Sequence, residues 1–189
     1  MTTKNILRKK IRAKLRKMSR ANRARASRGI IGRLRRFPEY VPSRSIFCFV
    51  SKADEPDTVG FLKAELAAGK RKIFMPRVSP DGIEAVRIKD MGELAKGHFG
   101  ILEPRPGMSA GVLPSGALIM VPGLAFDLRG MRLGRGKGYY DRFLRGRDRN
   151  KIVGIVFDDF LFERIPSRGH DVKSGAVITD KRVVLTIKK

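Results

Sequence analysis

The segment MRLGRGKGYYD, at positions 131–141, contains the residue pattern that most strongly indicates chemistry in this sequence. Glycine at every second position lets backbone amides point at a ligand and lets the ligand approach the chain closely. Arg135 and Lys137 stand between the glycines and add full positive charges. A helix beginning near Gly138 would add its free amide groups and the positive end of its dipole. The segment therefore predicts an anion site, and a polyphosphate fits it better than a single carboxylate does.

The alternative interpretation of this segment is a flexible surface turn whose charged residues face solvent. Its glycine spacing matches neither the P-loop pattern nor the dinucleotide-binding pattern, so the glycines alone are weak support for a binding site. The residues around the glycines must decide between the two interpretations.

Carboxylates near the glycine segment favour the binding interpretation. Asp141 falls in the first turn of the predicted helix, where it could simply complement the helix dipole. It could instead bind Mg²⁺, because Mg²⁺ takes one or two carboxylates together with phosphate oxygens. Asp127 and Asp171 lie near the ends of predicted strands, which is where open α/β sheets keep their sites.

Aromatic and acidic residues suit a flat heterocyclic ligand. Tyr139 could stack on such a ligand or hydrogen-bond to it, whereas Tyr140 shares a helix face with apolar residues and could belong to the core. Glu55, in the segment SKADEPDT, could accept hydrogen bonds from the N–H groups of a heterocycle. The simpler role for this segment is to cap the next helix through Asp57 or Thr58.

Composition argues against several other kinds of site. The single cysteine, Cys48, allows no internal disulfide and lies in an apolar run typical of a buried strand. His98 and His170 are the only histidines, so there is no zinc-ligand pattern and no hydrolase triad; both are expected to be structural or solvent-facing. No window approaches the roughly 18 continuous apolar residues of a membrane span. We expect a cytoplasmic protein, with an Arg-rich transit peptide as the less favoured interpretation of the N-terminus.

The charge is strongly positive and unevenly distributed. Lys and Arg number 42 against 18 Asp and Glu, a net charge of +24, and no acidic residue precedes Glu39. Such a charge indicates anionic partners, among them nucleic acid and polyanionic small molecules. Because no recognised nucleic-acid-reading motif appears, we expect nucleic acid only as a non-specific contact through the basic N-terminal helices.

The elements that position these residues follow from hydrophobic periodicity. An apolar stripe predicts a helix over 4–18, and Ser19 can cap a second helix that Pro38 stops. Short apolar runs predict buried strands at 45–50, 71–76, 117–123, 151–157, 175–180 and 182–187. The remaining segments are predicted as a helix at 58–69, an edge strand or hairpin arm at 82–88, an irregular segment at 101–116, a helix near 138–145 and a short helix or turn at 158–165.

Strands that alternate with helices, built from continuous apolar runs, indicate a mostly parallel sheet covered on both faces. We predict an α/β fold, a three-layer αβα sandwich with an antiparallel C-terminal strand pair and an N-terminal helical hairpin. The length of 189 residues and the lack of a clear linker predict a single domain over residues 1–189.

Five stretches spread over nearly the whole chain are specific enough to suggest a family. The longest is VPGLAFDLRGMRLGRGKGYYDRFL at 121–144, and the others are KNILRKKIR, SKADEPDT, GILEP and HDVKSGAVITD. With them the sequence resembles the 5-formyltetrahydrofolate cyclo-ligases, also called methenyltetrahydrofolate synthetases. The resemblance implies an enzyme that uses ATP and Mg²⁺ to convert 5-formyltetrahydrofolate into 5,10-methenyltetrahydrofolate through an N5-iminium phosphate, releasing ADP and phosphate.

The resemblance also implies roles for residues at matching positions. The ATP-binding positions would be Lys4, Asn5, Ile6, Leu7, Arg8, Arg132, Leu133, Gly134, Arg135, Gly136, Lys137, Gly138, Tyr139 and Tyr140. The folate-contacting positions would be Arg8, Val50, Glu55, Arg135, Gly136, Lys137, Gly138 and Tyr139. Asp141 and Asp171 would bind Mg²⁺, and we assign catalytic roles to Lys137 and Tyr140.

Two other interpretations stay open at this point. One is a different ATP-dependent ligase or kinase that uses the same glycine segment, and the other is a nucleic-acid-binding protein. For the cyclo-ligase interpretation the expected partners are ATP and 5-formyltetrahydrofolate, with no membrane association, and a monomer is favoured.

Overall fold

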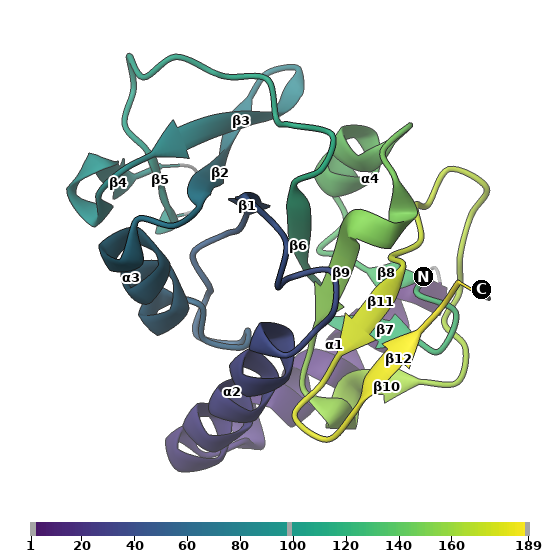
Figure 1. Ribbon diagram of the computed structural model, residues 1–189. Coiled ribbons are helices and arrows are strands. Elements are labelled where there is room, and N and C mark those ends of the chain that lie inside the picture. The colour runs from purple at the N-terminus through teal and green to yellow at the C-terminus, as the bar shows by residue number, and fades with distance from the viewer. Residues whose placement is uncertain (1–2, 98–99, 188–189) are drawn as a thin grey trace.

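The computed structural model describes residues 3–97 and 100–187 (Figure 1). His98 lies outside the described residues, so its expected role is not addressed by the structure. Among the residues described, no helix has the length and apolar character needed to cross a membrane.

Two helices open the chain, α1 (Thr3–Lys17) and α2 (Arg20–Arg35). Ser19 caps α2 as predicted, because its hydroxyl oxygen accepts a hydrogen bond from the backbone amide of Asn22 at 3.2 Å. Ile11 and Leu15, on the predicted stripe of α1, are buried in the hydrophobic core. The predicted N-terminal pair of helices is therefore confirmed.

A seven-stranded sheet with the order β12-β11-β9-β6-β1-β2-β3 forms the centre of the molecule. Its strands, in chain order, are β1 (Ser45–Phe47), β2 (Lys72–Ser79), β3 (Gly82–Ile88), β6 (Leu118–Pro122), β9 (Ile152–Ile155), β11 (Ala176–Ile178) and β12 (Val183–Leu185). The inner strand pairs are parallel, whereas β2 with β3 and β11 with β12 are antiparallel. The predicted mostly parallel sheet, its C-terminal antiparallel pair and the edge position of β3 are all confirmed.

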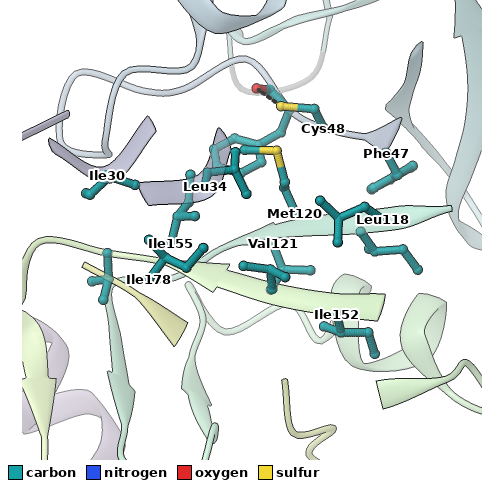
Figure 2. Close-up of a cluster of buried hydrophobic side chains, with 14 of the residues drawn as sticks. Ile30, Leu34, Phe47, Cys48, Leu118, Met120, Val121, Ile152, Ile155 and Ile178 are labelled. Carbon is teal, nitrogen blue, oxygen red and sulfur yellow. Dashed lines mark hydrogen bonds between the residues drawn. The ribbon is translucent and has the colours of Figure 1, made fainter. Parts of the chain in front are cut away.

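Helices cover both faces of this sheet. Figure 1 shows α2 and α3 (Val59–Ala68) on one side of the row of strands and α4 (Tyr139–Leu144) on the other. Phe143 of α4 stacks on Phe47 of β1, with ring centroids 4.6 Å apart. Figure 2 shows Ile30 and Leu34 of α2 in one cluster with apolar side chains of the inner strands. The predicted α/β layering is confirmed.

The segment after β1 enters the core and caps the next helix. The predicted strand 45–50 is cut short at Phe47, since the apolar run continues as buried chain rather than as strand. Burial raises the pKa of the Cys48 thiol to about 12, which fits an inert core cysteine. At the start of α3 the Asp57 carboxylate accepts a hydrogen bond from the amide of Val59 at 2.8 Å, and Gly69 ends the helix in the left-handed region.

Two small sheets were not predicted. The first joins β10 (Leu161–Phe162), β7 (Ala125–Asp127) and β8 (Arg132–Leu133), and the second joins β4 (Leu94–Lys96) and β5 (Leu102–Pro104). The prediction that residues 101–116 are irregular is therefore wrong near the start of this segment, where β5 pairs with β4. Strands of two or three residues are too short to show an alternating pattern, which explains why periodicity missed them.

Two glycines test how tightly the sheet is packed. A Cβ atom added at Gly154 of β9 would lie 2.3 Å from Cε1 of the buried Phe126 ring, whereas one at Gly60 of α3 would meet nothing within 4 Å.

We expect Gly154→Ala to lower the free energy of unfolding by about 1–3 kcal/mol, because the ring has no room to move. We expect Gly60→Ala to raise it by up to about 1 kcal/mol through helix propensity. Urea denaturation followed by circular dichroism measures both, and equal stability of the two variants would contradict this packing.

Candidate functional site

A cavity of about 580 Å³ lies at the carboxyl ends of β1 and β6, where open α/β sheets keep their sites. Its walls come from α1, the segment after β1, the β2–β3 hairpin, β5, the glycine segment with α4, and residues 168–171. Segments from the whole length of the chain therefore meet at one site.

The structure brings most of the predicted site residues together around this cavity. Those that line it are Lys4, Asn5, Arg8, Val50, Glu55, Arg132, Leu133, Gly134, Arg135, Gly136, Lys137, Gly138, Tyr139, Tyr140, Asp141 and Asp171. Ile6 and Leu7 do not line it: Ile6 is 45% exposed, and Leu7 packs against the hydrophobic core.

Asp127 also lies apart from the cavity. Its side chain is fully buried, and it accepts hydrogen bonds from the backbone amides of Arg129 at 3.0 Å, Met131 at 2.9 Å and Ile165 at 3.1 Å. This carboxylate therefore holds the turn between β7 and β8, and it does not reach the site.

The glycine segment forms a tight loop in front of α4. Gly136 and Gly138 have φ angles of 113° and 68°, which side chains rarely adopt, so these two positions require glycine. The α4 helix has only six residues, so the positive charge of the loop comes mainly from its side chains. Lys137 is exposed and has no ion-pair partner within residues 3–97 and 100–187.

Arg132 places a buried positive charge behind this loop. Its residue is 7% exposed, its Nη2 donates to Asp141 Oδ1 at 2.7 Å, and its guanidinium lies over the Tyr140 ring at 5.3 Å. Burial lowers its pKa, opposed by the charge of Asp141. Its Nη1 is buried and has no hydrogen-bond partner among the described residues.

Arg135 connects the glycine loop to the segment SKADEPDT. Its Nη2 donates to Asp54 Oδ1 at 2.5 Å and to Glu55 Oε1 at 2.9 Å. Burial alone would lower the pKa of Arg135, but the two carboxylates raise it. The second oxygen of Glu55 accepts a hydrogen bond from the amide of Lys52 at 2.9 Å. Each oxygen of Glu55 therefore already accepts one hydrogen bond.

The N-terminal helix closes one side of the cavity. Lys4 Nζ lies 2.6 Å from Asp171 Oδ2, and Arg8 Nε donates to the carbonyl oxygen of Gly134 at 2.9 Å. Burial would raise the pKa of Asp171, but Lys4 and the amide of Arg168 lower it, so this carboxylate is ionised near neutral pH. His170 is exposed, as expected of it.

The two acidic residues predicted to bind metal lie on adjoining segments. Asp141 Oδ1 accepts from the amide of Val172 at 3.3 Å, which is the residue next to Asp171. Each carboxylate keeps one oxygen that takes no hydrogen bond from the described residues, Asp141 Oδ2 and Asp171 Oδ1. Among the described residues, no cluster of three or more His, Cys, Asp or Glu side chains could form a metal site by itself. Two carboxylates suit Mg²⁺ that also takes phosphate oxygens from a ligand.

Sequence reasoning missed one acidic residue of the cavity. Glu103 of β5 is 5% exposed and lines the cavity, and its Oε2 accepts a hydrogen bond from the amide of Val78 at 3.1 Å. It lies in the stretch GILEP, where a single acid between apolar residues gave little reason to assign a role.

Comparison with known proteins finds relatives that match most of the chain. The model of the 5-formyltetrahydrofolate cyclo-ligase family matches residues 1–180. The curated 5-formyltetrahydrofolate cyclo-ligase of Mycolicibacterium smegmatis is 31% identical to this chain, and the alignment covers 89% of this chain and 88% of the relative. The curated 5-formyltetrahydrofolate cyclo-ligase of Mus musculus is 32% identical, and the alignment covers 94% of this chain and 93% of the relative. The structure of Aquifex aeolicus 5,10-methenyltetrahydrofolate synthetase superimposes with a TM-score of 0.85 at 32% identity, over 100% of this chain and 95% of that one.

These matches extend over almost the entire sequence, and the longest stretch of the resemblance, residues 121–144, contains the glycine loop and the Arg132–Asp141 pair of the cavity. The chain therefore belongs to the 5-formyltetrahydrofolate cyclo-ligase family of enzymes.

Proposed function

We propose that this protein catalyses the ATP- and Mg²⁺-dependent cyclisation of 5-formyltetrahydrofolate to 5,10-methenyltetrahydrofolate, with release of ADP and phosphate. Family membership supports the reaction class. The observation that carries the proposal is a cavity in which the basic side chains of Arg8, Arg132 and Lys137 adjoin apolar residues, with Lys137 unpaired among the described residues. Such a cavity suits a polyphosphate beside a flat heterocycle.

The proposed reaction activates a poor leaving group by phosphorylation. The formyl oxygen attacks the γ-phosphorus of ATP, a new P–O bond forms, and the bond to the ADP oxygen breaks. The product of this step is an N5-iminium phosphate. N10 then attacks the formyl carbon and loses its proton, and the carbon–oxygen bond breaks as phosphate leaves. No covalent protein nucleophile is required, and catalysis of phosphoryl transfer rests mainly on positioning and charge neutralisation.

The cationic residues of the cavity supply that neutralisation in the proposal. Lys137 would contact the transferred phosphoryl group, while Arg132, Lys4 and Arg8 would hold the remaining phosphates. Asp141 and Asp171 would hold Mg²⁺, which supplies further positive charge to the phosphates when it is bound.

Tyr140 would act as a hydrogen-bond donor at the reacting groups. Burial, with the nearby charge of Glu55, raises the pKa of Tyr140 well above its ordinary value, so the hydroxyl keeps its proton at neutral pH. Tyr139 and Val50, which line the same cavity, would border the folate.

The reaction itself is the first prediction. We expect the purified protein to convert 5-formyltetrahydrofolate only when both ATP and Mg²⁺ are present, with a rise in the near-ultraviolet absorbance of methenyltetrahydrofolate. Omission of ATP, or removal of Mg²⁺ with a chelator, is the control. No absorbance change at saturating substrates would exclude the cyclo-ligase activity, and ADP formation without the folate would instead favour a different ATP-using enzyme.

The metal assignment gives a second prediction. Asp141→Asn removes a charge from the proposed Mg²⁺ site and keeps the size of the side chain, so we expect turnover to fall by about tenfold or more and to need more Mg²⁺. The matched control is Asp81→Asn, in the exposed turn between β2 and β3. Thermal unfolding would show that both variants fold. A normal rate with a normal Mg²⁺ dependence in Asp141→Asn would refute this assignment.

The basic N-terminal helices keep a nucleic-acid contact open as a second candidate. Residues 1–38 hold 15 of the 42 Lys and Arg residues, and many of these side chains are exposed on α1 and α2. We expect RNA binding to be weak and to disappear by moderate salt, because a contact made only by charge releases counterions. A complex that resists salt and prefers one sequence, measured by fluorescence anisotropy, would contradict this expectation.

The location and the oligomeric state stay predictions. A cytoplasmic monomer is our expectation, while one relative, from Arabidopsis thaliana, is named as mitochondrial.

A further inference from the structure

Glu103 places a carboxylate in the cavity wall, and the proposed phosphate chemistry gives it no role. It sits on β5, next to apolar residues of the wall that include Val78, Ile83 and Ile101. A phosphate group would be repelled there, so this wall faces a different part of the ligands.

The carboxylate is buried with few partners. Glu103 is 5% exposed, and its single hydrogen bond within the described residues comes from the amide of Val78 to Oε2 at 3.1 Å. None of the Lys, Arg or His side chains described in the structure pairs with it. Its Oε1 therefore accepts no hydrogen bond from residues 3–97 or 100–187.

The surrounding backbone is shaped to hold this side chain in place. A Cβ atom added at Gly97 would lie 2.9 Å from Cδ of Glu103, so only glycine leaves room for the carboxylate against the β4–β5 hairpin. Burying a carboxylate without a cation costs free energy, which makes an unfilled acceptor at a cavity wall a strong site for ligand donors.

We infer that Glu103 binds adjacent N–H groups of the pterin ring and selects the folate substrate; this inference rests on the proposed function. The 2-amino group and the neighbouring ring N–H of a 2-amino-4-oxopteridine present two parallel donors, which a carboxylate can accept together. The apolar residues beside Glu103 suit the faces of such a ring.

Glu55 has a structural role beside the folate contact that the resemblance implies for it. Its Oε1 is bound by Arg135 and its Oε2 by the amide of Lys52. Glu55 would therefore also position Arg135 in the glycine loop, whereas Oε1 of Glu103 accepts no hydrogen bond from the described residues.

The substitution Glu103→Gln tests the inference with little disturbance, because a glutamine oxygen can still accept from the amide of Val78. Isothermal titration calorimetry without ATP would measure the dissociation constants of 5-formyltetrahydrofolate and of its analogue in which a methyl group replaces the 2-amino group. We expect the wild type to prefer 5-formyltetrahydrofolate by about tenfold or more, and Glu103→Gln to lose most of that preference. The dissociation constant of ATP should not change.

The control is Glu163→Gln, the same substitution at an exposed position outside the cavity, which should keep the wild-type preference. If Glu103→Gln preferred 5-formyltetrahydrofolate over the analogue as strongly as the wild type does, the inference would be overturned. A wild type that binds both compounds equally would also overturn it, whether or not the variant folds. Both results leave the proposed function standing if the wild type still turns over. A wild type that neither binds nor converts 5-formyltetrahydrofolate would overturn both.

Discussion

The rest of the site depends on the burial of one positive charge, the guanidinium of Arg132. A buried ion costs several kcal/mol unless a partner of opposite charge compensates it. Asp141 supplies that partner from α4 at 2.7 Å, so the ion pair ties α4 to β8 and fixes both ends of the glycine loop between them. Gly123 makes this possible, because a Cβ atom there would lie 2.9 Å from Cγ of Arg132.

Once the loop is fixed in this way, its remaining charges are divided between structure and ligand. Arg135 is held by two carboxylates, and the Gly134 carbonyl is held by Arg8 from α1. The carboxylates neutralise most of the charge of Arg135, whereas the carbonyl leaves the charge of Arg8 available to a ligand. The ammonium of Lys137 has no ion-pair partner within the described chain, so an anion gains most from contact with it. Ion pairs thus shape the cavity, and the charges of Lys137 and Arg8 are left to bind an anion.

The sequence was a good guide wherever a pattern extended over several residues. The stripe of α1, the cap at Ser19 and the apolar runs of the inner strands depend on local spacing, and the structure confirms them. The short strands β5 and β8 and the role of Glu103 depend on contacts between distant segments. A three-residue strand has no period to detect, and the lack of a cationic partner for Glu103 among the described residues is a property of its surroundings. The same limit applies to Glu55, whose availability could be judged only once Arg135 was placed beside it.

The large positive charge of the N-terminal helices does not by itself require a nucleic acid. Part of it holds the helices to the body of the protein through backbone carbonyls, which accept from guanidinium groups without any acidic partner. Arg23 donates to the carbonyls of Ala53 at 2.6 Å and Leu15 at 2.5 Å, and Arg33 reaches the carbonyl of Lys181 at 3.0 Å. Since α1 also forms one wall of the cavity, its unpaired charges raise the local concentration of anions at the entrance. Both proposed substrates are anions, so the charge excess has a use within the enzyme itself.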